Sequence, residues 1–397
     1  MGIAEALINW TCASPGIKRL SRQLLYFSLA LFIFSGCAPK APVHTPEPEP
    51  ATGDFYTGEG EPLSPDELIQ EIAGKDFILI GETHDNPCHH RIQAKIMDLL
   101  ASSGQKFVLG LEMVNVRKQD VLDSFNRGEI PLDDLPDRLE WSRTWGHDFD
   151  LYRPVFKTAR EHDIPVKALN LPSGVTRRIS HFGLDSLGPE DLGYLPEKIT
   201  LPPEEQLTHL EKQYEMHKDF IPRDRSDLEH FIQAQSAWDS KMAEMAGYYG
   251  HDHSLPVMVL AGSEHVRRGW GIEHRLLQMD KDADITRVLP VSDPGDISPD
   301  NPFYFYCPPA QGRMRLGLVI SRQEEGLVLA GVVDGSAADR AGFQKGDEII
   351  KAGDNSVQEM SDLHDAALKA AQSGEQVFFQ VRRSGEVKTL KIELPRE

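Results

Sequence analysis

Short apolar stretches that alternate with helix-like segments constrain the fold of this chain more than any other feature. The apolar stretches occupy residues 77–80, 107–112, 165–169 and 257–260. Apolar residues recur at helical spacing over residues 87–102 and again over residues 226–249. Strands that are apolar throughout are buried on both faces, as in a parallel sheet covered by helices. The sequence therefore predicts an α/β domain with a mainly parallel central sheet flanked by helices.

Two of these apolar stretches run directly into the same short motif, Gly-x-x-His. It occupies residues 81–84 and residues 262–265. Because ligands bind at the carboxyl ends of parallel strands, both motifs are expected at one edge of the sheet. A second strand ends at that level in a glutamate, so the predicted site comprises Glu82, His84, Glu112 and His265. Two imidazoles and two carboxylates could bind a divalent metal or carry out general acid–base catalysis.

Three polar residues on apolar helix faces are expected to support this site. His89 lies on the same face as Ile92, whereas Gln235 and Asp239 lie on the apolar face of residues 226–249. A polar group among apolar side chains must find a hydrogen-bond partner, and a position behind the site supplies one. For His89 an ordinary buried histidine explains the pattern equally well.

The first 63 residues have the features of an export signal followed by a tether. Residues 1–36 carry a basic segment and then an apolar run, residues 24–34, that is too short to cross a bilayer. Small residues precede Cys37 and resemble the bacterial lipobox, in which this cysteine is lipidated. We expect residues 37–63 to be a Pro-rich tether and order to begin at Ser64, a helix N-cap. The prediction is a lipid-anchored protein of the bacterial cell envelope, at the outer membrane and facing the periplasm.

The net charge and the number of cysteines argue against two features, a nucleic-acid partner and a disulfide. The formal net charge of −20 argues against a nucleic-acid partner, because phosphates require a basic surface. Beyond Cys37 the chain has only Cys88 and Cys307. A single pair in so long a chain is weak support for a disulfide, and we expect both cysteines to be unpaired.

Several short motifs follow one another through the main domain. They are residues 81–86, His89, His90, Glu112, Met113, Trp141, Tyr152, Gln235, Trp238, Asp239 and residues 265–267. Residues 64–292, which contain them, resemble the ChaN family of haem-binding lipoproteins within the Tiki superfamily. The resemblance implies haem as the cofactor, a role in haem or iron uptake, and a homodimer as the unit that holds haem. It favours a binding protein over an enzyme.

Haem needs an axial ligand above an apolar slot, with basic residues for its propionates. The axial candidates are Tyr152, Tyr214, His217 and His147, and the sequence does not rank them. The wider superfamily includes metal-dependent proteases and erythromycin-esterase-like proteins, which use similar Gly-x-x-His and Glu positions. A metal-dependent hydrolase that uses His84 and His265 is therefore the alternative, with a divalent metal as cofactor.

The last part of the chain has a different pattern of predicted secondary structure, with short strands and one helix. It follows a Pro-, Asp- and Gly-rich linker at residues 293–312, and its most specific stretch is residues 335–350. Residues 313–397 resemble PDZ domains of the HtrA type. The resemblance implies that a peptide or protein C-terminus binds as an added strand. The expected peptide-binding residues are Leu316, Gly317, Leu318, Val319 and Leu363. A scaffold in which only this domain is active, and the main site is vestigial, is a further alternative.

Overall fold

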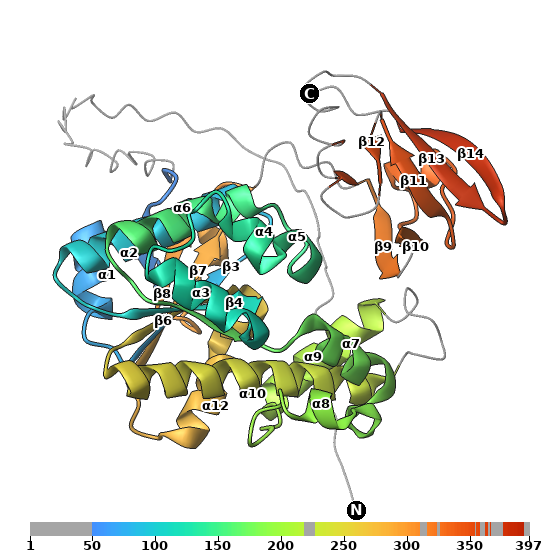
Figure 1. Ribbon diagram of the computed structural model, residues 1–397. Helices are drawn as coiled ribbons and strands as arrows, with labels where there is room; N and C mark the ends of the chain where they lie inside the picture. Colours follow the sequence, from blue (N-terminus) through green and yellow to red (C-terminus); the bar gives the residue numbers. More distant parts are fainter. Residues whose placement is uncertain are drawn as a thin grey trace, which may run out of the picture. The chain divides into compact units, whose positions relative to one another are not determined.

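Figure 1 shows the computed structural model of the protein. It describes residues 50–217, 227–309, 316–323, 326–353, 355–357, 362–363, 366 and 376–392. The expected signal segment and residues 37–49 of the expected tether, Cys37 included, lie outside these residues. Within the described part of the chain, no helix has the length and apolar character needed to cross a membrane.

The main domain is built on an eight-stranded sheet with the order β2-β1-β8-β7-β3-β6-β4-β5. Its strands are β1 (Phe55–Thr57), β2 (Pro62–Leu63), β3 (Phe77–Glu82), β4 (Val108–Asn115), β5 (Val166–Asn170), β6 (Val257–Gly262), β7 (Ile285–Val291) and β8 (Phe303–Tyr306). From β8 to β5 all neighbours are parallel, whereas β1 pairs antiparallel with both β2 and β8. The prediction of a mainly parallel sheet is confirmed.

Helices cover both faces of this sheet (Figure 1). They are α1 (Pro65–Ile72), α2 (Pro87–Ser102), α3 (Gln119–Asn126), α4 (Leu135–Leu139), α5 (Trp141–Thr144), α6 (Phe149–Glu161), α7 (Ser173–Phe182), α8 (Pro189–Leu192), α9 (Glu204–His217), α10 (Leu228–His253), α11 (Ser263–Val266) and α12 (Ile272–Met279). Alternate residues of β3 enter two separate cores. Ile78 and Ile80 pack with α2 and α6, whereas Leu79 packs with α10 and α12. The all-apolar strands of the sequence thus reflect burial on both faces.

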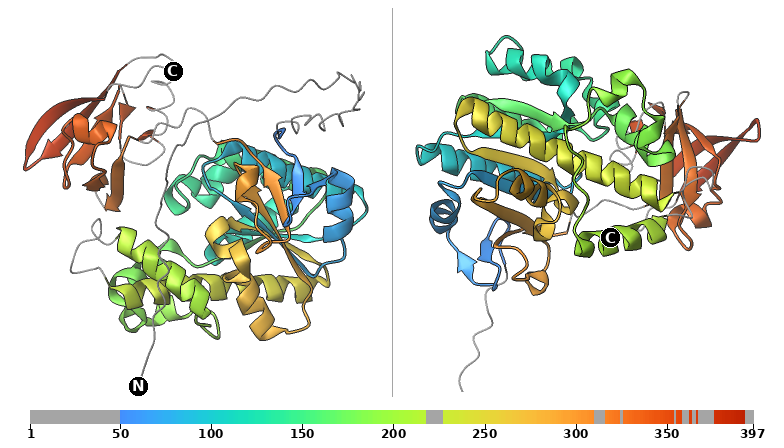
Figure 2. Two further views of the ribbon diagram at one scale, coloured as in Figure 1. Left: turned by 180° about the vertical axis from the view of Figure 1, so that it is seen from behind. Right: turned by 90° about the horizontal axis from the view of Figure 1, so that it is seen from below.

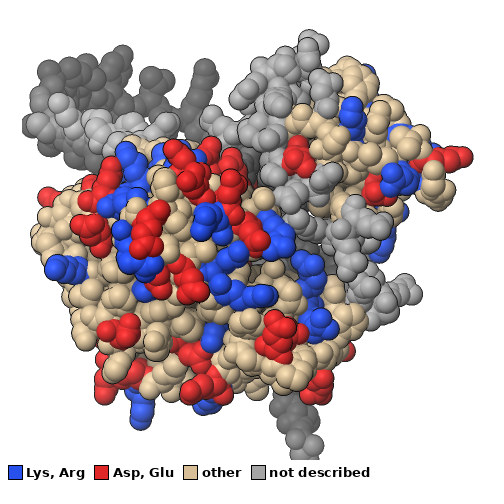
Figure 3. Space-filling view, viewed as in Figure 1, with Lys and Arg blue, Asp and Glu red and all other residues tan. Residues whose placement is uncertain are grey.

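A smaller helical layer joins one end of the long helix α10 (Figure 2). Helices α7, α8 and α9 surround it there, and Val175 and Ile179 of α7 form a third apolar cluster with Ala234 and Ala237 of α10. Figure 3 shows acidic and basic side chains intermingled over the visible face of the main domain. The acidic excess of the chain is therefore not gathered into one patch on that face.

The sheet extends into two segments that the sequence places in a tether and a linker. The tether was expected over residues 37–63 and the linker over residues 293–312, but β1 and β2 form in the first and β8 in the second. Phe55 of β1 pairs with Phe305 of β8, and both side chains are buried. These strands are only two to four residues long, so alternation could not reveal them. The expected helix start at Ser64 is confirmed by a capping box with Glu67.

Cys88 and Cys307 form a disulfide, so the expectation that they are unpaired is wrong. The bond joins the first turn of α2 to the residue after β8, and both cysteines are buried. They are 219 residues apart in sequence, yet their Cα atoms are 6.0 Å apart. The position of β8 within the sheet, between β1 and β7, brings them together, and no spacing rule in the sequence contains that information.

The C-terminal region forms a separate antiparallel sheet with the order β14-β13-β11-β10-β9, and β12 pairs with β11. Its elements are β9 (Leu318–Gln323), β10 (Gly326–Val332), α13 (Ala337–Arg340), β11 (Glu348–Ala352), β12 (Asn355–Ser356), β13 (Val377–Arg383) and β14 (Glu386–Ile392). Strand β9 lies at the edge, where a further strand can pair with it. Gly317 precedes it with a positive φ of 82°, and a Cβ there would clash with Ser336. Of the expected helix after residue 361, the described residues include Leu363, which is buried in this core.

Candidate functional site

The two Gly-x-x-His motifs lie at the same edge of the sheet. Strands β3 and β6 are parallel neighbours, and Glu82 is in register with Gly262. A Cβ on Gly262 would lie 3.0 Å from His84 Nε2 and 3.6 Å from Glu112 Oε2. Glycine at this position therefore leaves room for the imidazole of the other motif. The geometry brings the four residues of the predicted rim together.

The carboxylate of Glu82 is the centre of a buried hydrogen-bond network. It contacts His84 Nδ1 at 2.8 Å and accepts from the Tyr152 hydroxyl at 2.5 Å and from Gln93 Nε2 at 2.9 Å. His90 Nδ1 is 3.4 Å away. Burial raises the pKa of Glu82, but hydrogen bonds with His84 and His90 outweigh burial and lower this pKa well below its usual range. Glu82 is therefore an anion that fixes the surrounding side chains.

One ring nitrogen of His84 pairs with a buried carboxylate, and the other is left to contact a ligand. Its Nδ1 is paired with Glu82, and about 30% of its side chain is exposed. Burial lowers the pKa of His84, but the hydrogen bond to Glu82 and the charge of Glu112 outweigh burial and raise it. A carboxylate that holds Nδ1 leaves Nε2 to meet a ligand or a proton acceptor.

His265 is held in the same way by a different carboxylate. Its Nδ1 contacts Asp239 Oδ1 at 2.6 Å, and its Nε2 lies 3.5 Å from Glu112 Oε1. Burial alone lowers the pKa of His265, but the charges of Glu112 and Asp239 outweigh burial and raise it to about 9. His265 is therefore protonated at neutral pH. Asp239 also accepts from Gln206 Nε2 at 3.1 Å, so it is fixed from behind.

Glu112 lies between the two histidines, and one of its carboxylate oxygens accepts no hydrogen bond from the described residues. Its Oε2 accepts the backbone N–H of Gly262 at 2.6 Å. Its Oε1 is buried and has no hydrogen-bond partner among the described residues. An unpaired carboxylate oxygen in the interior is costly, and such groups often mark the position of a ligand or proton donor. The side of Glu112 that faces His265 is therefore the place in the site where a ligand could supply the missing hydrogen bond.

The three residues that were expected to support the site, His89, Gln235 and Asp239, differ in where they lie relative to it. Asp239 contacts His265, as expected of a supporting residue, whereas Gln235 lines a pocket beside the site. His89 Nδ1 accepts the N–H of Thr83 at 2.8 Å, and its Nε2 lies 3.0 Å from the Asn86 amide. Burial lowers the pKa of His89 to about 4, so it is neutral. His89 fixes the loop after the first motif and does not enter the site.

Sequence periodicity missed His90 and Gln93, which contact Glu82 directly. Residues 88–90 are all buried, because the first turn of α2 is enclosed on several sides. An apolar stripe describes a helix with one buried face, and that assumption fails at this turn. The only available signal was the pair of adjacent histidines after an N-cap and a proline.

A pocket of about 320 Å³ opens beside both histidines. The Trp145 ring lies 4.8 Å from the His84 ring, and the Trp238 ring lies 5.1 Å from the His265 ring. Both tryptophans line the pocket. The other lining side chains include Met113, Arg177, Phe231 and Gln235. The lining is thus mixed: three aromatic rings (Trp145, Phe231 and Trp238) lie among Ser, Thr, Asn and Gln side chains, with one basic residue.

The four axial candidates are placed very differently. Tyr152 is fully buried and its hydroxyl is bound to Glu82, so this structure does not present it to a ligand. The His147 ring is 5.4 Å from that of His84, at the site. The Tyr214 ring is 6.0 Å from Phe231 of the pocket. His217 ends α9, but its side chain lies outside the described part of the structure.

The expected divalent-metal site gains no support from the geometry. Among the described residues, no group of three or more His, Cys, Asp or Glu side chains is arranged to hold a metal ion. In the rim, each histidine pairs its Nδ1 with a carboxylate, an arrangement that metal-ligating histidines also use. The arrangement is one of two separate carboxylate–imidazole pairs around Glu112.

Comparison with known families and structures agrees with this architecture. The sequence model of a family described as haem-binding uptake, Tiki superfamily, ChaN matches residues 68–276. A PDZ model matches residues 314–394. A search of curated proteins found no match.

Two solved structures cover the two parts of the chain. ChaN of Campylobacter jejuni, described with cofacial haem binding, has a TM-score of 0.51 and 21% identity, and the match covers 64% of this chain and 95% of that one. At this identity the likeness shows the fold alone. The HtrA3 PDZ domain bound to a phage-derived ligand has a TM-score of 0.16 and 24% identity, and the match covers 18% of this chain and 64% of that one.

Proposed function

The chain belongs to the ChaN family of haem-binding uptake proteins in the Tiki superfamily, and on this premise we propose that it binds haem and handles haem or iron at the bacterial cell envelope. The observation that carries the proposal is the pocket beside His84 and His147, in whose lining Trp145, Phe231 and Trp238 supply aromatic rings. A PDZ domain at residues 314–394 recruits a peptide or a partner protein.

The side chains around the pocket fit haem in kind. Haem requires an axial His, Tyr, Met or Cys, an apolar slot and basic groups for its propionates. His147 and Tyr214 are the axial candidates nearest to the pocket, and Arg177 supplies a cation. Bound haem would supply an iron centre whose reactivity depends on the axial ligand. The pocket is too small to enclose a porphyrin, so part of the ring would protrude, which supports a homodimer as the haem-holding unit.

Titration of the purified protein with haemin is expected to give a saturable shift of the Soret band. His147→Ala should weaken binding at least tenfold, which corresponds to about 1.4 kcal/mol, and should alter the band position because the axial ligand changes. The matched control is His162→Ala, since His162 pairs with Asp98 on the surface and lies in no part of the site. A titration without saturation would contradict the proposal. Equal affinity of wild type and His147→Ala would reassign the ligand, and Tyr214→Phe would then be the decisive variant.

Glu112 provides a specific reason to retain hydrolysis as a second candidate function. Its Oε1 accepts no hydrogen bond from the described residues but forms an ion pair with His265 Nε2 at 3.5 Å, and both groups are buried. A carboxylate and an imidazolium at this distance can exchange a proton with a substrate or a water between them. Ester or peptide hydrolysis by the purified protein, lost in Glu112→Gln, would favour this candidate. Its dependence on added divalent metal would decide whether a metal takes part.

The edge strand β9 is the place where the PDZ domain should bind its peptide. We expect a peptide with a free C-terminal carboxylate to bind more tightly than its amidated form, because the resemblance to HtrA-type PDZ domains assigns the carboxylate-binding loop to the residues around Gly317. Gly317→Ala should weaken binding more than tenfold, since the new Cβ meets Ser336 and φ is positive. Gly385→Ala is the matched control, because its φ of 85° is similar but the space around it is open. Fluorescence anisotropy with a peptide from a C-terminal display library measures both. Similar losses in the two variants would contradict this assignment.

Anchoring through a lipid on Cys37 and residence in the outer membrane belong to the same proposal. The buried disulfide supports export, because such bonds persist in oxidising compartments and are rare in the cytosol.

A further inference from the structure

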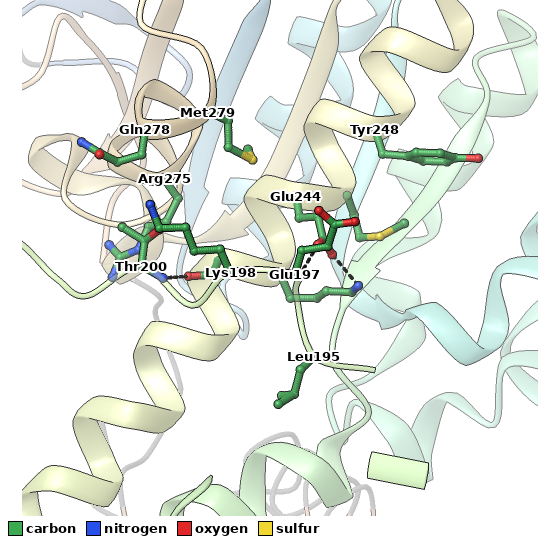
Figure 4. A pocket seen from close by; sticks show the side chains of 12 residues that line it. Leu195, Glu197, Lys198, Thr200, Glu244, Tyr248, Arg275, Gln278 and Met279 are labelled. Atoms are coloured by element: carbon green, nitrogen blue, oxygen red, sulfur yellow. Dashed lines mark hydrogen bonds and ion pairs between the residues drawn. The ribbon is translucent and has the colours of Figure 1, made fainter. Parts of the chain in front are cut away.

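A second and larger pocket lies farther along α10 from the haem-binding candidate. Its volume is about 640 Å³, and it is formed by α10, α12 and the segment from residue 195 to residue 200 (Figure 4). None of its lining residues is a member of the rim formed by Glu82, His84, Glu112 and His265. The family assignment gives this pocket no role.

Arg275 lines this pocket and keeps two buried hydrogen-bond donors unused. Only 2% of its side chain is exposed, and it is among the lining residues. One terminal nitrogen donates to Gln206 Oε1 at 2.7 Å, to the Gly271 carbonyl at 3.1 Å and to the Trp270 carbonyl. The other terminal nitrogen and Nε have no partner among the described residues. A guanidinium is always charged, and leaving two of its donors buried and unpaired is costly.

Those two unused donors belong to one edge of the guanidinium. Nε and one terminal nitrogen form the fork that binds both oxygens of a carboxylate at once. Asp239 lies 3.5 Å from the opposite nitrogen, so it does not occupy this edge. An anion in the pocket would therefore complete the hydrogen bonding of Arg275 and leave its contact with Asp239 in place.

The other charges of the pocket leave a positive excess. Lys241 is paired with Glu244 at 2.6 Å, and Glu244 also accepts the N–H of Glu197 at 2.7 Å. Lys198 has no ion pair within the described part of the chain and is exposed. The lining thus has three cations against two carboxylates, because Glu197 also belongs to it. With Lys241 paired to Glu244, Lys198 and Arg275 are the cations that remain for a ligand.

The rest of the pocket wall is apolar. Met245, Tyr248 and Met279 line it, and Tyr248 and Met279 are 58% and 55% exposed. Figure 4 shows Tyr248 on the opposite side of the pocket from Arg275. Large apolar side chains that stay this exposed beside a cationic end suit a ligand with a charged head and an apolar body.

We propose that this pocket binds a small amphipathic carboxylate. The carboxylate pairs with the free edge of Arg275 and with Lys198, and the apolar chain lies against Met245, Tyr248 and Met279. The ligand is distinct from haem, and the site does not depend on the haem-binding proposal.

Calorimetric titration of the purified protein with octanoate tests the proposal, with acetate and 1-octanol as comparison ligands. We expect saturable binding of one octanoate. Acetate lacks the apolar body and octanol lacks the charge, so each should bind at least tenfold more weakly. The absence of saturable octanoate binding, or equal binding of octanol, would overturn the proposal.

Charge reversal at Lys198 provides the variant test, because this residue is exposed and its replacement leaves the core unchanged. Lys198→Glu should weaken octanoate binding about tenfold, whereas the matched control Lys106→Glu, an exposed lysine outside the pocket, should leave it unchanged. Arg275→Lys should abolish measurable binding, and circular dichroism checks that this variant is folded. Equal affinity in Lys198→Glu and wild type would overturn the assignment. The haemin titration is a separate measurement, so failure of either proposal can be recognised independently.

Discussion

Replacing Glu82 with alanine is expected to lower the free energy of unfolding by about 3–5 kcal/mol, the range seen when one partner of a buried charged network is removed. The substitution leaves the Tyr152 hydroxyl and the Gln93 amide without the acceptor they share. It also removes the anion that His84 and His90 face. These groups remain in a site that water barely reaches, so their lost hydrogen bonds are not replaced.

Tryptophan fluorescence during denaturant unfolding measures this change in the main domain alone. The PDZ domain contains no tryptophan, and four of the five tryptophans lie in residues 141–270. The matched control is Glu264→Ala in the second motif, because Glu264 is exposed and pairs with His209 on the surface. Exposed ion pairs contribute about 0–1 kcal/mol. Similar losses in the two variants would show that the network around Glu82 does not stabilise the domain.

The difference in the free energy of unfolding between wild type and Glu82→Ala should depend on pH. The pKa of Glu82 is lowered in the folded state by hydrogen bonds with His84 and His90, which outweigh burial. Its stabilising contribution is therefore present above the unfolded pKa, about 4.3, and is lost as pH falls below that value. Wild type and Glu82→Ala should thus approach each other in stability in acid.

The sequence was sufficient to predict which residues form the rim of the site, but not which carboxylate contacts which histidine. A repeated Gly-x-x-His after all-apolar strands puts His84 and His265 at one edge in any parallel sheet, and the structure has them there. Asp239 could be found because a carboxylate on an apolar helix face needs a partner. The partner itself could not be found, since the choice between the two histidines depends on how α10 crosses the sheet.

Contacts between distant segments account for what the sequence did not show. Tyr152 was expected as a ligand for haem, but α6 packs against α2 and delivers its hydroxyl to Glu82, 70 residues earlier. The disulfide between Cys88 and Cys307 depends on β8, a strand too short to predict. Neither contact has a local pattern, because each is set by the packing of whole elements.

His265 should make the main domain lose stability as the solution becomes alkaline. Burial lowers its pKa, but Glu112 and Asp239 outweigh burial and raise it from 6.5 to about 9 in the folded state. A raised pKa means that the stabilising contribution is fully present below pH 6.5 and disappears as pH rises towards 9. A shift of this size corresponds to about 3 kcal/mol. Arg275 also faces this cluster, 3.5 Å from Asp239, and His84 faces both Glu112 and His265.

Denaturant unfolding at several pH values between 6 and 10, followed by tryptophan fluorescence, tests this expectation. Wild type should lose up to about 3 kcal/mol across that range from this residue, whereas His265→Gln should be less stable at pH 6 and nearly insensitive to pH. His162→Gln is the matched control, because that imidazole pairs with Asp98 at the surface. If wild type and His265→Gln gave parallel curves, the pKa of His265 would be the same in the folded and unfolded protein, and its imidazole would be mostly neutral above pH 7. Glu112 would then have no cation beside its unpaired oxygen, and the second candidate function would lose its proton donor.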